Sequence, residues 1–282
     1  MPGTYVLGVG TSSCNFGCLF CQNHNISKDR EIVGADISPE ELIEMAKAEH
    51  AQGIAYTYNE PAIFIEYALD VAKLAHKNKM YNVFVTNGYL TKEAIDKMKG
   101  LIDAAVVDFK GNGSEKFANK YMAVASTRPI YEALVYMKQM GIHIEITDLV
   151  VPQVGDSLED CDSLTKWIRD NLGADTPLQF LTFFPDYKML NLPMTPYKTL
   201  LEHYAVAKKN GLNYVYLGNA PGNPYENTYC PKCGSKVIGR NGFEITEWNL
   251  DEHNRCARCG EEIKIVGGKP KELGPKEIKV FY

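Results

Sequence analysis

The chain has 282 residues, of which 45% are hydrophobic, and its formal net charge at pH 7 is −5. This length suits one large domain, alone or with a small appendage, and the acidic balance disfavours a surface that coats nucleic acid. No apolar run reaches about 18 residues and no basic stretch precedes an apolar one at the N-terminus, so we expect a cytoplasmic protein without a membrane span or signal peptide.

Three cysteines, Cys14, Cys18 and Cys21, follow the first predicted strand, 5–9, at CxxxCxxC spacing. Three thiolates hold a [4Fe–4S] cluster and leave one iron without a protein ligand, and an open coordination position is typical of catalytic metal sites. Three unrelated buried thiols are the alternative, because free cysteine is among the most buried residue types. The triple spacing, the preceding strand and the turn at Gly17 favour the cluster.

Short β-branched or aromatic runs alternate with longer helical patterns up to about residue 218, which is typical of parallel βα repeats. Ser38 to Glu41 is a capping box with Pro39 at the first helical position, a clear helix start. Six or seven such units predict a partial or full βα barrel. The expected strands are 5–9, 54–58, 82–86, 104–109, 143–151, 178–183 and 214–217, and the expected helices are 39–52, 61–78, 91–99, 128–140, 158–171 and 197–210.

Polar residues follow the second, third and fourth predicted strands. Glu60, Asn87 and Lys110 each stand at or just after a strand end. In a βα barrel the C-terminal ends of the strands carry the site, so we expect these side chains to lie near the cysteines. Asp108 and Lys110 are two residues apart on a strand and should point to the same face. The alternatives are a helix-terminal acid at Glu60, an ordinary turn at Asn87 and an intrastrand ion pair between Asp108 and Lys110.

The periodicity stops after residues 219–225, where turn residues dominate. We therefore expect a barrel domain over residues 1–222 and a small module over residues 223–282, ending in a short strand at 277–282. Two CxxC pairs, each followed by glycine, predict a tetrathiolate zinc-ribbon or rubredoxin-like module that holds zinc or iron. Four thiolates leave no open position, which favours a structural metal, with electron transfer through bound iron as the alternative. The four ligands are Cys230, Cys233, Cys256 and Cys259.

The cysteine motif after the first strand, the acidic turn after the second and the Asn-Gly turn after the third together resemble the radical S-adenosylmethionine (SAM) superfamily. The resemblance covers nearly all of residues 4–260. It is strongest to the group related to pyruvate formate-lyase activating enzymes, and within it to the radical SAM proteins of the AmmeMemoRadiSam system. Its motifs are Thr57-Tyr-Asn-Glu-Pro61, Val85-Thr-Asn-Gly88, Val107-Asp-Phe-Lys110 and Phe183-Phe-Pro-Asp-Tyr-Lys188.

The resemblance implies that SAM binds the open iron of a [4Fe–4S] cluster and is cleaved by one electron to methionine and a 5′-deoxyadenosyl radical, which abstracts hydrogen from a substrate. Glu60 takes the place of the acidic turn that receives the methionine amino group, with Tyr58 and Asn59 where relatives carry glycines. The other implied SAM contacts are Thr86, Asn87 and Asp108 on the ribose, Lys110 on the carboxylate, and Leu149 and Val151 on the adenine, where barrel core is the alternative.

The leading hypothesis is a radical SAM enzyme supplied by an electron donor such as a ferredoxin or flavodoxin and acting on an unidentified substrate, with a protein as one candidate. Pro185-Asp186-Tyr187 stands where activating enzymes typically carry a histidine, which argues against a formate-lyase-type substrate. A radical SAM enzyme that modifies RNA or a metabolite, and a non-enzymatic iron–sulfur electron-transfer or binding module, are the alternatives. Relatives have an N-terminal extension, so we expect a further domain to precede this sequence or to come from a partner.

Overall fold

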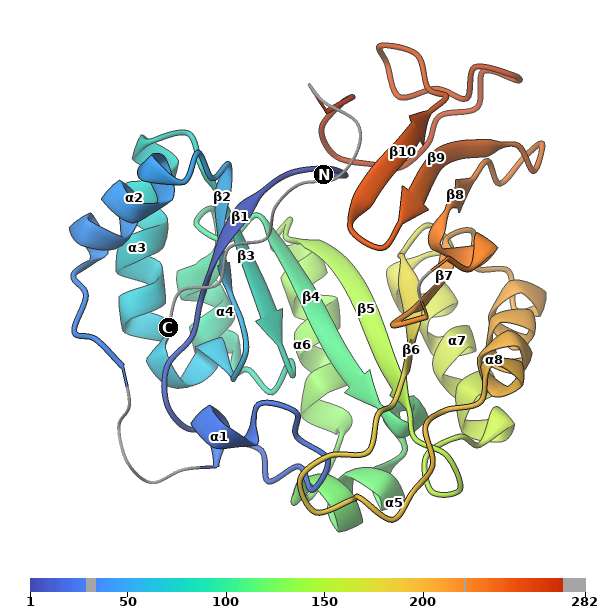
Figure 1. Ribbon diagram of the computed structural model, residues 1–282, viewed down its shortest axis with the longest axis horizontal. Helices are drawn as coiled ribbons and strands as arrows, with labels where there is room; N and C mark the ends of the chain where they lie inside the picture. Colours follow the sequence, from blue (N-terminus) through green and yellow to red (C-terminus); the bar gives the residue numbers. More distant parts are fainter. Residues whose placement is uncertain (29–33, 221, 271–282) are drawn as a thin grey trace.

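A computed structural model describes residues 1–28, 34–220 and 222–270, so the strand expected at 277–282 lies outside the described residues. Seven parallel strands form one sheet in chain order, and within the described residues the first and seventh strands do not pair. The sheet is curved but open, so the fold is a partial βα barrel and the predicted fold class is confirmed (Figure 1). The strands are β1 (Val6–Val9), β2 (Gly53–Tyr56), β3 (Tyr81–Thr86), β4 (Ala104–Lys110), β5 (His143–Val150), β6 (Leu178–Thr182) and β7 (Val215–Gly218).

Helices cover the convex face of the sheet, one after almost every strand (Figure 1). None of the helices among the described residues has the length and apolar character needed to cross a membrane. The main helices are α2 (Pro39–Ala48), α3 (Ile65–Lys77), α4 (Lys92–Met98), α6 (Arg128–Gln139), α7 (Leu158–Leu172) and α8 (Tyr197–Lys209). The capping box at the start of α2 is present, with the Glu41 carboxylate accepting from the Ser38 backbone N–H at 2.8 Å.

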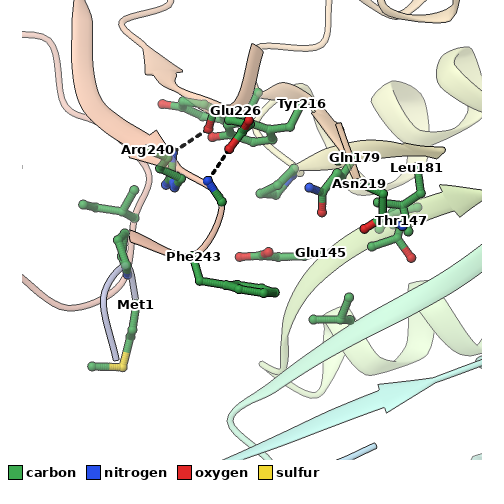
Figure 2. Close-up of a pocket in the computed structure, with 18 of the residues that line it drawn as sticks. Met1, Glu145, Thr147, Gln179, Leu181, Tyr216, Asn219, Glu226, Arg240 and Phe243 are labelled. Carbon is green, nitrogen blue, oxygen red and sulfur yellow. Dashed lines mark hydrogen bonds between the residues drawn. The ribbon is translucent and has the colours of Figure 1, made fainter. Parts of the chain in front are cut away.

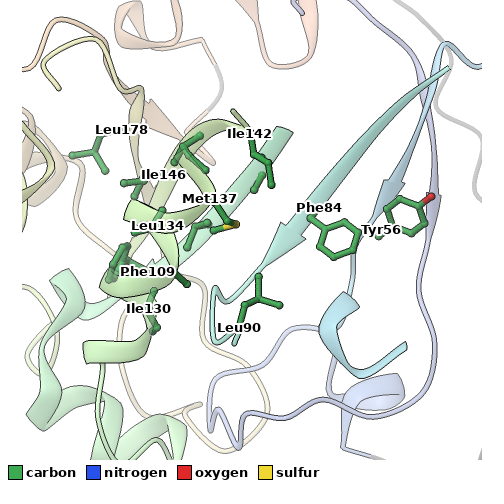
Figure 3. Packing of buried hydrophobic residues seen from close by; sticks show 14 of the residues in the cluster. Tyr56, Phe84, Leu90, Phe109, Ile130, Leu134, Met137, Ile142, Ile146 and Leu178 are labelled. Atoms are coloured by element: carbon green, nitrogen blue, oxygen red, sulfur yellow. The ribbon is translucent and has the colours of Figure 1, made fainter. Parts of the chain in front are cut away.

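The core lies between this helical layer and the sheet. Along β4 burial alternates, so that Val107 and Phe109 are buried against the helices while Asp108 and Lys110 face the concave side. Figure 3 shows Phe109 packed with apolar side chains of α6, such as Leu134. The convex face of the sheet therefore packs against the helices in the hydrophobic core, and the concave face carries polar side chains and cavities.

Short elements that the sequence does not predict cluster at the C-terminal edge of the sheet. They are α1 (His24–Ser27), η2 (Gly111–Gly113), α5 (Glu115–Phe117) and η3 (Ala118–Met122). The helix predicted at 61–78 begins as a separate 3₁₀ turn, η1 (Pro61–Phe64), before α3. Two predicted elements end earlier than expected because a residue takes a left-handed conformation: β2 stops before Tyr58, with φ 70°, and α2 stops before His50, with φ 54°.

The C-terminal residues form an antiparallel ribbon at the opposite, N-terminal edge of the sheet (Figure 1). Its strands pair in the order β10, β9, β8. An apolar cluster that includes Val237 and Ile263 of the ribbon also contains Tyr214, the residue before β7, so the ribbon packs on the barrel. The elements are η4 (Pro224–Glu226), β8 (Thr228–Tyr229), β9 (Lys236–Asn241) and β10 (Glu244–Trp248).

Gly88 follows β3 with φ 73°, and a methyl group there would lie 2.8 Å from Val107 Cγ1 and 3.0 Å from Ile130 Cγ2. We expect Gly88→Ala to lower the free energy of unfolding by about 2–4 kcal/mol, from the left-handed backbone and from overpacking together. Gly100 has φ 71° and open space around it, so Gly100→Ala should cost only the backbone share, about 1–2 kcal/mol. Denaturant unfolding measures both, and equal losses would contradict the packing argument.

Candidate functional site

A cavity of about 270 Å³ opens at the C-terminal edge of the sheet. The cluster loop, residues 10–23, forms one wall, and the ends of β2 to β6 form the others. Val151 does not line this cavity and is fully buried in the core. The sequence-predicted residues that do line it are Cys14, Cys18, Cys21, Asn59, Glu60, Thr86, Asn87, Asp108, Lys110 and Leu149.

The cluster loop is held by backbone bonds to neighbouring segments. Gly17 N–H donates to the Met122 carbonyl at 2.8 Å, and Leu19 N–H donates to the Tyr121 carbonyl at 2.9 Å. The unpredicted helix η3 therefore stabilises the cluster loop by accepting hydrogen bonds from its backbone. The three thiols thus face one cavity from a loop that backbone hydrogen bonds tie to η3.

The three thiols line one cavity, where they could hold a metal cluster together. Burial raises the pKa of Cys18 to about 11, against the opposing charges of Lys110 and Lys28, and burial also raises the pKa of Cys14. The raised pKa values keep Cys14 and Cys18 protonated at neutral pH in the metal-free chain, whereas a bound metal deprotonates its thiol ligands. The donor set and the polar wall facing it match a three-cysteine cluster site.

The turn after β2 is tied directly to the cluster loop through Asn59. Its Nδ2 donates to the carbonyls of Thr11 and Ser13 at 2.8 and 2.7 Å, and its Oδ1 accepts from Thr11 N–H at 3.2 Å. From the loop side, Asn23 Nδ2 donates to the Tyr58 carbonyl at 2.6 Å. Asn59 therefore positions the loop that carries the cysteines.

Tyr58 forms a γ-turn in which Asn59 N–H donates to the Thr57 carbonyl at 2.9 Å, with φ 70° at Tyr58. This conformation is strained for a residue with a side chain, and such strain is common at functional sites. The Tyr58 ring lies over Gly8 of β1, where a Cβ would come within 2.9 Å of its hydroxyl. Tyr58 thus keeps a backbone shape suited to glycine, and its ring also lines the cavity.

Glu60 is almost fully buried and is held by three donors. Its Oε1 accepts from Ala62 N–H at 3.0 Å and from Thr86 Oγ1 at 2.7 Å, and its Oε2 accepts from Asn87 N–H at 2.7 Å. Burial raises the pKa of Glu60 to about 6, although these hydrogen bonds lower it. Glu60 joins the turns after β2 and β3, and its Oε2 keeps the capacity to accept one more hydrogen bond.

Lys110 and Asp108 form an ion pair of 3.1 Å on the cavity wall, and the Thr147 hydroxyl also donates to Asp108. Burial lowers the pKa of Lys110, but Asp108 and Cys18 outweigh it and the net pKa is raised, so Lys110 is a cation at neutral pH. Lys28 is a second cation near the thiols and donates to the Phe16 carbonyl. No sequence motif marks Lys28, so its place near the thiols emerges only in the folded chain.

Lys110 is followed by the left-handed turn of η2. A buried hydrogen-bond network that includes Asp148 and Asn112 stabilises this turn. Asp148 Oδ1 accepts from Asn112 N–H at 3.0 Å. Asn112 Nδ2 donates to His203 Nε2 and the Ser157 carbonyl, both at 3.2 Å, which orients the amide. Among the described residues, Asn112 Oδ1 and Asp148 Oδ2 are the buried side-chain atoms without a partner. Burial raises the pKa of Asp148 to about 7, so this carboxyl group is partly protonated at neutral pH and its proton is available as a donor.

The four C-terminal cysteines converge into a second, separate centre, with all four sulfurs within 4.8 Å of one another. The sulfur atoms of Cys230 and Cys259 are 3.6 Å apart, and those of Cys233 and Cys256 are 3.7 Å apart. Four sulfurs at about 2.3 Å from a tetrahedral metal would lie about 3.8 Å apart, so the set fits a closed metal site.

Comparisons with known proteins agree with this arrangement. The sequence pattern of the Radical SAM superfamily matches residues 9–168. The chain is 41% identical over 268 residues to the uncharacterized protein MJ0808 of Methanocaldococcus jannaschii, covering 94% of this chain and 79% of that protein. It is 22% identical over 164 residues to the putative glycyl-radical enzyme activating enzyme MJ1632 of the same organism, covering 57% of this chain and 61% of that protein.

Two solved structures share the fold at low sequence identity. A radical SAM methyltransferase from Sphaerobacter thermophilus superposes with a TM-score of 0.59 at 13% identity, covering 74% of this chain and 64% of that one. Streptococcus suis SuiB, bound to the precursor peptide SuiA, superposes with a TM-score of 0.57 at 16% identity, covering 75% of this chain and 49% of that one.

The buried acid predicts a pH effect on stability. A pKa raised from 3.8 to about 7 means that the stabilising contribution of protonated Asp148 is complete below about pH 4 and is lost as pH rises through 7. Asp148→Asn supplies a permanent donor, so its stability should not depend on this titration. The difference in free energy of unfolding between Asp148→Asn and the natural chain should therefore be roughly 1–3 kcal/mol larger at pH 8 than at pH 5. Parallel stability curves over this range would contradict the protonated acid.

The four-cysteine centre predicts one metal ion per chain in addition to any cluster. Cys256→Ser leaves three thiolates and an open position, so we expect this variant to lose that ion and the ribbon to lose its fold at a lower temperature. Elemental analysis and thermal melting check this, and the absorbance of a barrel cluster in the same sample is the internal control. Full metal retention by Cys256→Ser would exclude a four-ligand site.

Proposed function

The chain belongs to the radical SAM superfamily of enzymes, and we propose that it binds SAM in the cavity at the C-terminal edge and uses it to remove a hydrogen atom from a substrate. The observation that carries the proposal is the meeting of three thiols with a polar wall in one cavity. A [4Fe–4S] cluster held by Cys14, Cys18 and Cys21 would supply the electron that cleaves SAM to methionine and a 5′-deoxyadenosyl radical.

The residues around the cavity suit the parts of SAM. Lys110 is a partly buried cation that would hold the carboxylate of SAM, and Oε2 of Glu60 has a free acceptor position for its amino group. Asn87, which also donates to Asn15 of the cluster loop at 2.7 Å, and Thr86 lie where the ribose would sit beside Asp108. We assign Leu149 to the adenine and leave Val151 out, because it does not reach the cavity.

Aromatic side chains would keep water away from the reacting atoms. Phe16 and Phe20 come from the cluster loop, and Phe183 comes from the loop after β6; all three are buried and line the cavity. Excluding water strengthens electrostatic contacts in the site and limits side reactions of a reactive intermediate. The reductant in this proposal is a small electron-transfer protein such as a ferredoxin or flavodoxin.

A polypeptide is our first candidate for the substrate. Large apolar side chains are exposed on the loops after β2, β3 and β6, and two of them, Tyr58 and Phe184, line the cavity itself. Exposed apolar groups at a cavity mark an interaction surface. The similarity to a putative activating enzyme and to a peptide-bound structure is in line with this candidate. The exposed residues are Tyr58, Tyr89, Phe184, Leu190 and Met194.

The test is SAM cleavage by anaerobically reconstituted, reduced protein, followed as 5′-deoxyadenosine. We expect Cys18→Ala to reduce the rate by at least about 100-fold, because two thiolates do not hold the cluster. Cys161→Ala is the matched control, since Cys161 is a buried thiol on α7 that does not line the cavity, and it should cleave SAM at the natural rate. Equal activity of the natural chain and Cys18→Ala would refute the proposal.

A further inference from the structure

A second cavity of about 550 Å³ lies on the concave face of the sheet, between β5, β6, β7 and the C-terminal ribbon (Figure 2). We call it the inner chamber. It shares two lining residues, Leu181 and Asn219, with the cavity that contains the cysteines. The two spaces therefore meet at the ends of β6 and β7, so a molecule in the inner chamber would border the SAM site.

The ribbon supplies one wall of the inner chamber. Arg240 of β9 donates to the Glu226 carbonyl at 3.1 Å and to Thr228 Oγ1 at 2.7 Å, and its guanidinium lies 5.6 Å from the centre of the Tyr216 ring. The Glu226 carboxylate accepts from Gly242 N–H. These charged groups are thus engaged in holding the ribbon against β7, and they act mainly as structure.

Other polar groups in the chamber have few or no partners. The side-chain amide of Gln179 makes no hydrogen bond within the part of the chain that the structure describes, and that of Asn219 makes one long bond of 3.5 Å to the Thr182 carbonyl. Among the described residues, Glu145 makes one side-chain hydrogen bond, with His143 Nε2 at 3.3 Å. Its side chain is 46% exposed, and Figure 2 shows it reaching into the space between the strands and the ribbon.

Glu145 is ionised at neutral pH. Desolvation raises its pKa, but the hydrogen bond and charge of His143 and the charge of Arg240 lower it, and the net pKa lies below the usual range. The facing hairpin adds the Phe243 ring, which is 89% exposed and also lines the chamber. An exposed aromatic ring and a carboxylate with one hydrogen-bond partner line the same chamber, and these two groups can bind an organic cation through ion pairing and cation–π attraction.

We infer that the inner chamber binds the ammonium group of the substrate, with Glu145 as counter-ion and Phe243 as the aromatic contact. The rest of the substrate would pass Gln179 and Asn219, whose free amides can bond polar groups, and reach the SAM cavity. The chemical class is a protonated primary amine, supplied either by a lysine side chain or by a free diamine. The reaction of the bound substrate rests on the proposed function, but the binding of the substrate to the inner chamber does not.

The experiment measures binding by calorimetry to the full chain, without SAM or reductant, so a failure of SAM cleavage leaves the result intact. The probes are 1,5-diaminopentane, a capped tripeptide with central lysine, and the same peptide with norleucine in place of lysine. We expect the natural chain to bind an ammonium probe and to bind the norleucine peptide at least 10-fold more weakly. Binding of the peptide but not the diamine identifies a polypeptide source, and the reverse identifies a free amine.

The variants test the two residues separately. Glu145→Gln should weaken ammonium binding at least 10-fold, and Phe243→Ala about 3-fold, a change at an exposed hairpin tip that should leave the fold intact. Glu252→Gln, on an exposed ribbon carboxylate outside the chamber, should bind like the natural chain. The inference is overturned if neither ammonium probe binds, if the lysine and norleucine peptides both bind and do so with equal affinity, or if Phe243→Ala and Glu145→Gln both bind the ammonium probe as tightly as the natural chain.

Discussion

The alternation of side chains along parallel strands sorts the whole molecule into a core and a site. On β4 the odd-numbered neighbours Val107 and Phe109 enter the helical layer, while Asp108 and Lys110 face the concave side. The same register holds from strand to strand, with Asp108 beside Thr147 on β5. Since all strands run in one direction, their polar ends meet at one edge, and every residue of the proposed SAM site depends on that arrangement.

Most of the fold could be predicted because its signals are local. Period-two and helical patterns mark all seven barrel strands and six helices within a few residues, and the CxxC pairs mark the ribbon. The chain reversals at the strand ends could not be predicted, because they depend on contacts between distant segments. Tyr58 adopts a left-handed γ-turn, and its carbonyl accepts a hydrogen bond from Asn23 of the cluster loop. The carbonyls of Tyr121 and Met122 in η3 accept hydrogen bonds from the N–H groups of the same loop.

The site was predictable as a set of positions but not as a set of interactions. Strand-end placement brings Glu60 and Lys110 to the cavity, as their positions in the sequence suggest. The hydrogen bonds of Glu60 to Thr86 and Asn87, and the network of Asp148 behind Lys110, arise only in the folded chain. Val151 was wrongly expected at the site. An apolar residue at a strand end can belong to the hydrophobic core or contact a ligand, and the sequence does not separate the two; Val151 is buried in the core.

The strictly sequential order of the sheet also bears on how the chain acquires its structure. Each strand pairs with the one synthesised just before it, so the sheet can grow outward from β1 without waiting for a distant partner. The cysteine loop and the turns after β2, β3 and β4 lie in the first half of the chain, and the ribbon comes last. A nascent chain can therefore assemble the thiol-bearing half of the cavity while the wall of the inner chamber is still being translated.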